Sequence, residues 1–291
     1  MATSFDVDGM RVDRIIEGQY PFIAAQDFLA GLTDQMLAEA RGWMQAMGAL
    51  DARDWLVMCM QSYVIRTPHH TILVDSCVGN DKQRPNRPFW HLKTDDTYMQ
   101  ALAVAGLAVE DIDYVMCTHL HVDHVGWNTR LVDGRWVPTF PNARYLFADQ
   151  EYAYWEAENA KKTVYPFADS VLPIVEAGRH ELVSSSLVLN DHIRLLPTPG
   201  HTLDHYAVAI GRGRDAAVIT GDLIHSPIQA RHTGLSMKGD FDRVQSAATR
   251  HAFLERYCDT DTQCCTAHFP SPSRMRVRRW EDGFRCEPVT G

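Results

Sequence analysis

The segment 117–128, CTHLHVDHVGWN, places four strong metal ligands within six residues, namely His119, His121, Asp123 and His124. Imidazole and carboxylate groups together suit zinc and its neighbours among the first-row metals. A solvated surface segment rarely gathers them at this spacing, so we interpret the cluster as a metal site. A chain with this cluster must fold so that the segment faces inward.

The local sequence indicates how the cluster is presented. DYVMCT (113–118) is a short apolar run that predicts a buried strand ending at the ligands. His119 and His121 are two residues apart, so in extended chain they point to the same side and can reach one ion. Asp123 and His124 follow as the chain turns, and they can reach a second ion. Gly126 permits a tight turn directly after them.

Four ligands cannot complete two sites, so further ligands must come from downstream. Three candidates follow strand-like runs and small residues: His201 in TPGHT, Asp222 in VITGD and His268 in CTAHFP. Ligands at the ends of several strands can converge on one sheet edge, which is where pockets form in layered α/β folds.

The rest of the chain reads as alternating runs of strands and helices, which predicts a layered α/β fold. We expect a helix within 21–48, with Thr33 as N-cap and Gly48 as its end, an antiparallel hairpin of 55–67 and 71–76, and a long loop over 79–91. Further helices are expected at 95–106, 149–160 and 241–258, and further strands at 143–148, 187–198, 205–211, 216–222 and, as the last, 263–268.

Composition narrows the classes of function. The formal net charge of −9 argues against a nucleic-acid partner and against docking on anionic membranes. The N-terminus lacks the pattern of a signal peptide, no apolar run is long enough to span a membrane, and the seven cysteines are scattered. We therefore expect a cytoplasmic protein of one domain, 1–291, in which 1–54 is an extension carrying a helix and 55–291 is the core. The apolar face of that helix packs on the fold or forms a homodimer contact.

The combination of HxHxDH at 119–124, GH at 200–201, GD at 221–222 and AH at 267–268 resembles the metallo-β-lactamase superfamily. The resemblance implies an αββα sandwich of two mixed β-sheets flanked by helices, with a cofactor of two Zn²⁺ ions per chain. It assigns His119, His121 and His201 to the first zinc, and Asp123, His124 and His268 to the second. Asp222 bridges the two ions, and a bridging hydroxide is the nucleophile.

Within the superfamily, THLHVDHVGWN, TPGHT and TGDLIHSPIQ look like the quorum-quenching lactonases and the methyl parathion hydrolase group. Acyl-homoserine lactonases carry a tyrosine three residues after the bridging aspartate, whereas this chain has His225, which is associated with organophosphate hydrolysis. The resemblance implies opening of a lactone or other small ester as a small-molecule substrate. Hydrolysis of organophosphate triesters, hydrolytic dehalogenation and amide hydrolysis stay open as alternatives. Asp123 or Asp222 would carry the proton to the leaving group, and His225 would bond the oxyanion or only steady Asp222.

Other residues have two interpretations each. Asp75 after ILVD resembles an aspartate that orients a metal-bound imidazole, although it could be a turn residue. Six further residues either contact the substrate or site, or serve only packing or the surface: His205, His232, Phe89, Trp90, Trp127 and Met237. We expect His69 and His70 in the hairpin turn to be solvated only.

Overall fold

The computed structural model describes residues 4–289, and these divide into two compact units. The first, called here the HxHxDH unit, contains residues 4–17 and 60–187. The second, called the C-terminal unit, contains residues 18–59 and 188–289. The expected organisation as one domain with an extension over 1–54 stays a prediction. All seven cysteines are free thiols.

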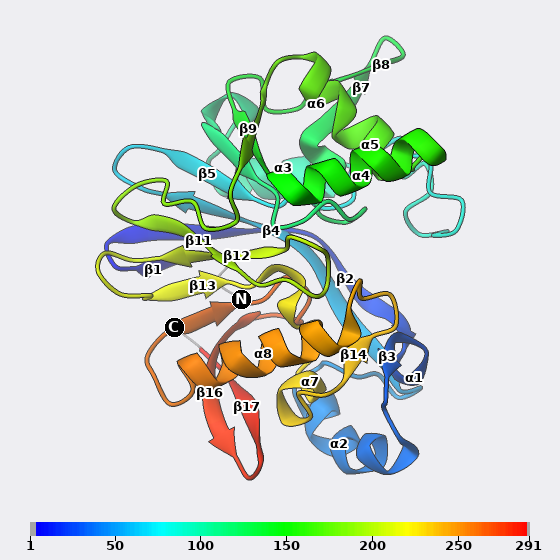
Figure 1. Ribbon diagram of the computed structural model, residues 1–291, viewed down its shortest axis with the longest axis vertical. Coiled ribbons are helices and arrows are strands. Elements are labelled where there is room, and N and C mark those ends of the chain that lie inside the picture. The colour runs from blue at the N-terminus through cyan, green and yellow to red at the C-terminus, as the bar shows by residue number, and fades with distance from the viewer. Residues whose placement is uncertain (1–3, 290–291) are drawn as a thin grey trace. The chain divides into compact units, whose positions relative to one another are not determined.

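The HxHxDH unit is built on a seven-stranded mixed sheet in the order β1-β2-β4-β5-β6-β9-β10 (Figure 1). Strand β4 pairs antiparallel with β5, as the sequence predicts, and β5, β6, β9 and β10 then run parallel. Parallel strands bring their carboxyl ends to one edge, so the segments after β5 and β6 lie near each other. The strands are β1 (Ser4–Val7), β2 (Met10–Ala24), β4 (Trp55–Arg66), β5 (Thr71–Val74), β6 (Tyr114–Met116), β9 (Arg144–Ala148) and β10 (His180–Val183).

One face of this sheet is covered by helices through a continuous apolar core. Val115 and Phe147 from the strands are fully buried with Tyr98 from α3 and Phe167 from α5. The helices at 95–106 and 149–160 are confirmed, and 79–91 is a loop as expected. The elements around the core are α3 (Thr97–Val104), η1 (Val109–Asp111), η2 (Gly126–Asn128), α4 (Asp149–Lys161), α5 (Tyr165–Ser170), α6 (Leu172–Glu176) and the hairpin β7 (Thr129–Val132) and β8 (Arg135–Pro138).

The C-terminal unit is built on a six-stranded mixed sheet in the order β11-β12-β13-β15-β16-β17. Helix α8 (Arg243–Tyr257) packs against β16 (Figure 1). Its Phe253 and Leu254 share a core with Val277 and Phe284. The other elements of this unit are β11 (Ile193–Pro197), β12 (Tyr206–Ile210), β13 (Ala217–Ile219), η3 (Gly221–Leu223), α7 (Ile228–Arg231), β14 (Ser236–Met237), β15 (Gln263–Cys265), β16 (Arg274–Trp280) and β17 (Gly283–Pro288).

Two sequence expectations were wrong at the ends of the chain. The strand at 263–268 is not the last, because β16 and β17 form a further hairpin. The run RMRVRRW in β16 alternates arginine with Met275 and Val277, which is the pattern of a half-buried strand, and its register with β17 is regular. Residues 21–24, the start of the segment 21–48 expected to carry a helix, instead form the end of β2.

The predicted helix within 21–48 is divided in the structure. It comprises α1 (Ala25–Phe28), the short strand β3 (Leu29–Ala30) and α2 (Asp34–Ala46). Gly31 has a φ of +86°, which a continuous helix cannot accommodate, and Thr33 caps α2 by accepting a hydrogen bond from the Met36 amide. Helix α2 packs within its unit, where Trp43 meets the ring of Trp280 edge-on.

Gly126 is confined by its neighbours, and it gives a test of the ligand turn. A Cβ atom at Gly126 would lie 1.9 Å from the Val78 carbonyl oxygen, so backbone would have to move. We expect Gly126→Ala to lower the free energy of unfolding by about 3 kcal/mol or more, measured by urea denaturation. Gly134→Ala is the control, because that glycine has nothing within 4 Å and only a φ of +75° to lose. It should cost about 1 kcal/mol; equal losses for the two variants would contradict the steric account.

Candidate metal centre

Strand β6 delivers the four clustered ligands of the HxHxDH unit. The chain leaves β6 at Met116 and turns, so that the imidazole of His119 lies 4.5 Å from that of His121 and 4.0 Å from that of His124, measured between ring centroids. His119 and His124 are buried, while His121 and Asp123 are partly accessible. The structure therefore brings together the four ligands predicted from this segment.

Asp75 holds two members of this cluster in place, His124 directly and His119 through Thr118. Its carboxylate lies 2.9 Å from Nδ1 of His124 and accepts hydrogen bonds from the amide and hydroxyl of Thr118. The same hydroxyl lies 3.1 Å from Nδ1 of His119. Because Nδ1 of both histidines is engaged, Nε2 is the nitrogen left to each ring for binding a metal. Asp75 is buried at a φ of +59°, which shows how tightly its position is defined.

The C-terminal unit brings its three predicted ligands together around one carboxylate. His201 follows β11, Asp222 lies in η3 after β13, and His268 follows β15. Nε2 of His201 lies 3.2 Å from Oδ2 of Asp222, and Nε2 of His268 lies 2.9 Å from Oδ1. Each carboxylate oxygen thus faces a different imidazole, which is the arrangement that a carboxylate shared by two ions requires.

The imidazoles of the two predicted histidine ligands in this unit, His201 and His268, are oriented by different groups. Nδ1 of His201 lies 2.7 Å from a carboxylate oxygen of Asp240, whereas Nδ1 of His268 lies 3.0 Å from the backbone carbonyl oxygen of Cys59. In both rings Nε2 faces the Asp222 carboxylate. No sequence motif marks Asp240, which is 39 residues away from its partner.

Two further histidines hold Asp222 in place. His205 accepts a hydrogen bond from the Asp222 amide at Nε2, so its Nδ1 carries the proton and donates to the Thr198 hydroxyl. This settles the sequence alternatives for His205 in favour of support for the site. Nε2 of His225 lies 3.1 Å from Oδ2 of Asp222 and donates to it.

The charge states of these groups follow from their surroundings. Burial alone would lower the pKa of His201, but the carboxylates of Asp222 and Asp240 outweigh it and raise the pKa to about 9. A metal ion at Nε2 would therefore displace a proton. Burial lowers the pKa of His225, so this ring is neutral at pH 7. A neutral His225 that donates through Nε2 presents only a lone pair at Nδ1, which makes no hydrogen bond to the described residues.

The other candidate residues divide between packing and the site. Trp127 is buried, stacks on Tyr98 and donates its indole N–H to Glu17, so it is a core residue. Trp90 is also buried, whereas the neighbouring Phe89 is 70% exposed.

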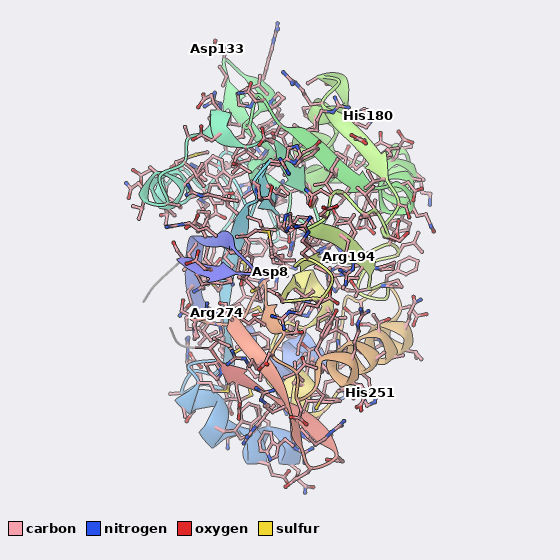
Figure 2. All side chains as sticks on the ribbon, turned by 90° about the vertical axis from the view of Figure 1, so that its left-hand side faces the viewer. Asp8, Asp133, His180, Arg194, His251 and Arg274 are labelled. Atoms are coloured by element: carbon pink, nitrogen blue, oxygen red, sulfur yellow. The ribbon has the colours of Figure 1, made fainter. Side chains whose placement is uncertain are left out.

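His69 and His70 lie in the turn between β4 and β5. His180 in β10 and His251 in α8, labelled in Figure 2, contact Tyr152 and Phe284 and lie outside both ligand sets. His232 is half-buried, and its pKa is lowered first by burial and then by the positive charge of Arg231. The backbone amide of Met237 donates a hydrogen bond to the Asp240 carboxylate.

Sequence reasoning missed Arg250, a fully buried arginine in α8. Its guanidinium donates to the carbonyl oxygens of Leu223, Thr233 and Leu235. Burial lowers its pKa to about 10, so it stays charged at pH 7. Arg250 thereby ties the turn that carries Asp222 to the segment that leads into β14.

The sequence pattern of the metallo-beta-lactamase superfamily matches residues 61–268, and the chain belongs to this superfamily. The match includes all seven predicted ligands. The predicted fold class, with two mixed sheets flanked by helices, is thereby confirmed. Among residues 4–289, no helix combines the length and apolar character needed to cross a membrane.

Solved structures with this fold include two that cover 99% of the chain and 97% of their own. One is AidC, a dizinc quorum-quenching lactonase in complex with its product N-hexanoyl-L-homoserine, at 20% identity and a TM-score of 0.81. The other is AbOPH, a hydrolase of the β-lactamase superfamily, at 19% identity and a TM-score of 0.81. An N-acyl homoserine lactonase of a Bacillus species is 26% identical over 167 residues, which cover 54% of this chain. The chain spans 43 to 60% of the length of the curated relatives it matches.

The buried guanidinium gives a stability prediction. Arg250→Met keeps an apolar stem but removes this donor from the carbonyl oxygens of Leu223, Thr233 and Leu235, the last of which keeps a hydrogen bond from Gln229. We expect a loss of about 3 kcal/mol in the free energy of unfolding, because each orphaned acceptor costs about 1–3 kcal/mol. Arg256→Met in the same helix removes a more exposed ion pair with Asp215 and should cost less than about 1 kcal/mol. Urea denaturation of both variants measures the difference, and similar losses would refute the role of Arg250.

Proposed function

We propose that the protein is a metal-dependent hydrolase that holds two zinc ions and opens a lactone or another small ester. The observation that carries the proposal is the Asp222 carboxylate, whose two oxygens face His201 and His268 separately. The donor set supports it, because imidazole and carboxylate groups in this number suit two zinc ions. Superfamily membership supports the same reading.

In this proposal the two ligand sets act together. His119, His121 and His201 hold one ion, and Asp123, His124 and His268 hold the other, with Asp222 between them. When bound, two such ions supply a hydroxide at neutral pH and polarise the substrate's reacting group. The chain's own residues do the rest: Asp75, Asp240 and the Cys59 carbonyl fix the imidazoles, and Asp123 or Asp222 carries the proton to the leaving group.

A lactone or small ester is proposed because the protein resembles an N-acyl homoserine lactonase in sequence and a quorum-quenching lactonase in fold. Organophosphate triester hydrolysis, hydrolytic dehalogenation and amide hydrolysis would use the same groups and are the alternatives. We also propose that the substrate is the small-molecule partner and that the protein works in the cytoplasm, without nucleic-acid or membrane partners. A homodimer through the helix region 26–48 belongs to the same proposal.

The test is a turnover screen of zinc-loaded protein against lactones, aryl esters, phosphotriesters and chlorinated aromatics. We expect about two zinc equivalents per chain by elemental analysis and hydrolysis of a lactone or aryl ester that a chelator abolishes and added zinc restores. Asp222→Ala and His121→Ala should remove most activity, because each deletes a ligand. His70→Ala is the matched control and should keep activity, since its ring packs against Tyr114 and His69 in a turn.

Three results would refute the proposal in different ways. One zinc equivalent or none after reloading would refute the two-ion site. Turnover that persists with a chelator would refute metal dependence. Loss of activity in His70→Ala as large as in Asp222→Ala would show that the ligand assignment is wrong.

His225 gives a separate prediction about mechanism. If it bonds the oxyanion, His225→Ala should lower kcat by about 10²–10³ at unchanged zinc content. The hydrogen bond to Oδ2 of Asp222 favours the other role, in which His225 steadies the carboxylate. In that case His225→Ala should lower zinc affinity, and excess zinc should restore kcat. Kinetics with and without added zinc separate the two roles, and a kcat defect that zinc does not repair would establish the oxyanion role.

A further inference from the structure

Asp240 is a buried carboxylate held between the His201 imidazole and the backbone of its own loop. Its Oδ1 lies 2.7 Å from Nδ1 of His201, and both side chains are 1% exposed. Its Oδ2 accepts a hydrogen bond of 3.1 Å from the Met237 amide. Because each oxygen has a fixed partner, the carboxylate cannot rotate without breaking one of these bonds.

The loop that carries Asp240 is itself fastened to the turn that carries His201. The Phe241 amide donates to the His201 carbonyl oxygen at 3.0 Å, and the Asp242 amide donates to the Gly200 carbonyl oxygen at 2.9 Å. A Cβ at Gly200 would lie 2.3 Å from the Ser246 nitrogen, so only glycine lets the His201 turn approach α8, the helix that follows this loop, so closely. Asp240 therefore meets His201 through backbone docking as well as through its side chain.

The support of His201 differs in kind from that of His268 in the same unit. His268 donates Nδ1–H to a backbone carbonyl oxygen, which orients the ring but adds no net charge. His201 faces a carboxylate, which orients the ring and also makes its Nε2 a stronger electron donor. His201 and His268 therefore differ in the charge of the group that accepts a hydrogen bond from Nδ1: a carboxylate for His201 and a neutral carbonyl for His268.

We propose that Asp240 is a positioning residue that orients His201 and strengthens its Nε2 as a metal ligand, and so raises the protein's affinity for zinc. The inference rests on the metal-binding part of the proposed function and does not depend on the substrate. Partners of this kind typically change metal affinity by about 10–100-fold when they are lost.

The experiment compares zinc affinity by competition with a chromophoric chelator for the wild-type protein, Asp240→Asn, Asp240→Ala and Asp242→Asn. Asp240→Asn keeps an oxygen for Nδ1–H but removes the charge, and Asp240→Ala removes both. We expect weaker zinc binding by about 10-fold for the first and up to about 100-fold for the second. Asp242→Asn is the control, since that side chain caps α8 through the Val244 and Gln245 amides and makes no bond to His201 in the described structure.

A readout independent of affinity is the imidazole ¹⁵N spectrum, in which the His201 Nδ1–H should be retained in Asp240→Asn and lost or weakened in Asp240→Ala. Wild-type zinc affinity in both Asp240 variants would overturn the inference. An equal loss in Asp242→Asn would also overturn it, because loop packing would then explain the effect. A wild-type protein that binds no zinc would refute the inference together with the proposed site. If zinc affinity falls from wild type to Asp240→Asn to Asp240→Ala but the wild-type protein hydrolyses nothing in the screen, only the proposed hydrolase function is refuted.

Discussion

The Asp222 carboxylate is the interaction on which the rest of the C-terminal ligand set depends. It stands between two imidazoles, and its amide and one oxygen are held by His205 and His225. A carboxylate surrounded by three histidines in a buried site loses its hydration, so it is stable there only if hydrogen bonds or cations replace the water. His225 supplies such a bond to Oδ2 in the protein alone, and cations would strengthen the arrangement further. The fold around η3 is organised to provide these partners.

The supports behind the ligands follow one rule in both units. Three ligand rings have a ring nitrogen that meets a fixed acceptor: Asp75 behind His124, Asp240 behind His201 and a main-chain carbonyl behind His268. Backbone amides in turn hold the two carboxylates, that of Thr118 at Asp75 and that of Met237 at Asp240. Orientation of the ligands is therefore a property of the folded chain and precedes any metal.

Much of the candidate site could be predicted from the sequence, because its ligands follow short apolar strands with small residues beside them. The HxHxDH cluster, the β4–β5 hairpin and the three downstream ligands were recognised in this way. The partners of the ligands were harder to predict. Asp240 and Arg250 lie in polar stretches with no motif, and only tertiary contacts bring them to the site. The hairpin β16–β17 was missed even though arginine alternates with Met275 and Val277 in β16, a period of two that marks a half-buried strand.

The carbonyl of Cys59 behind His268 has a consequence for how the protein can change over time. A main-chain acceptor is present whatever side chain occupies position 59, so point mutation cannot readily remove it. Asp240, by contrast, is encoded as a side chain and can be replaced in a single step. Natural variation among related sequences, or a directed-evolution campaign, therefore has an accessible control point at one imidazole and almost none at the other. Any divergence in metal preference should begin on the His201 side.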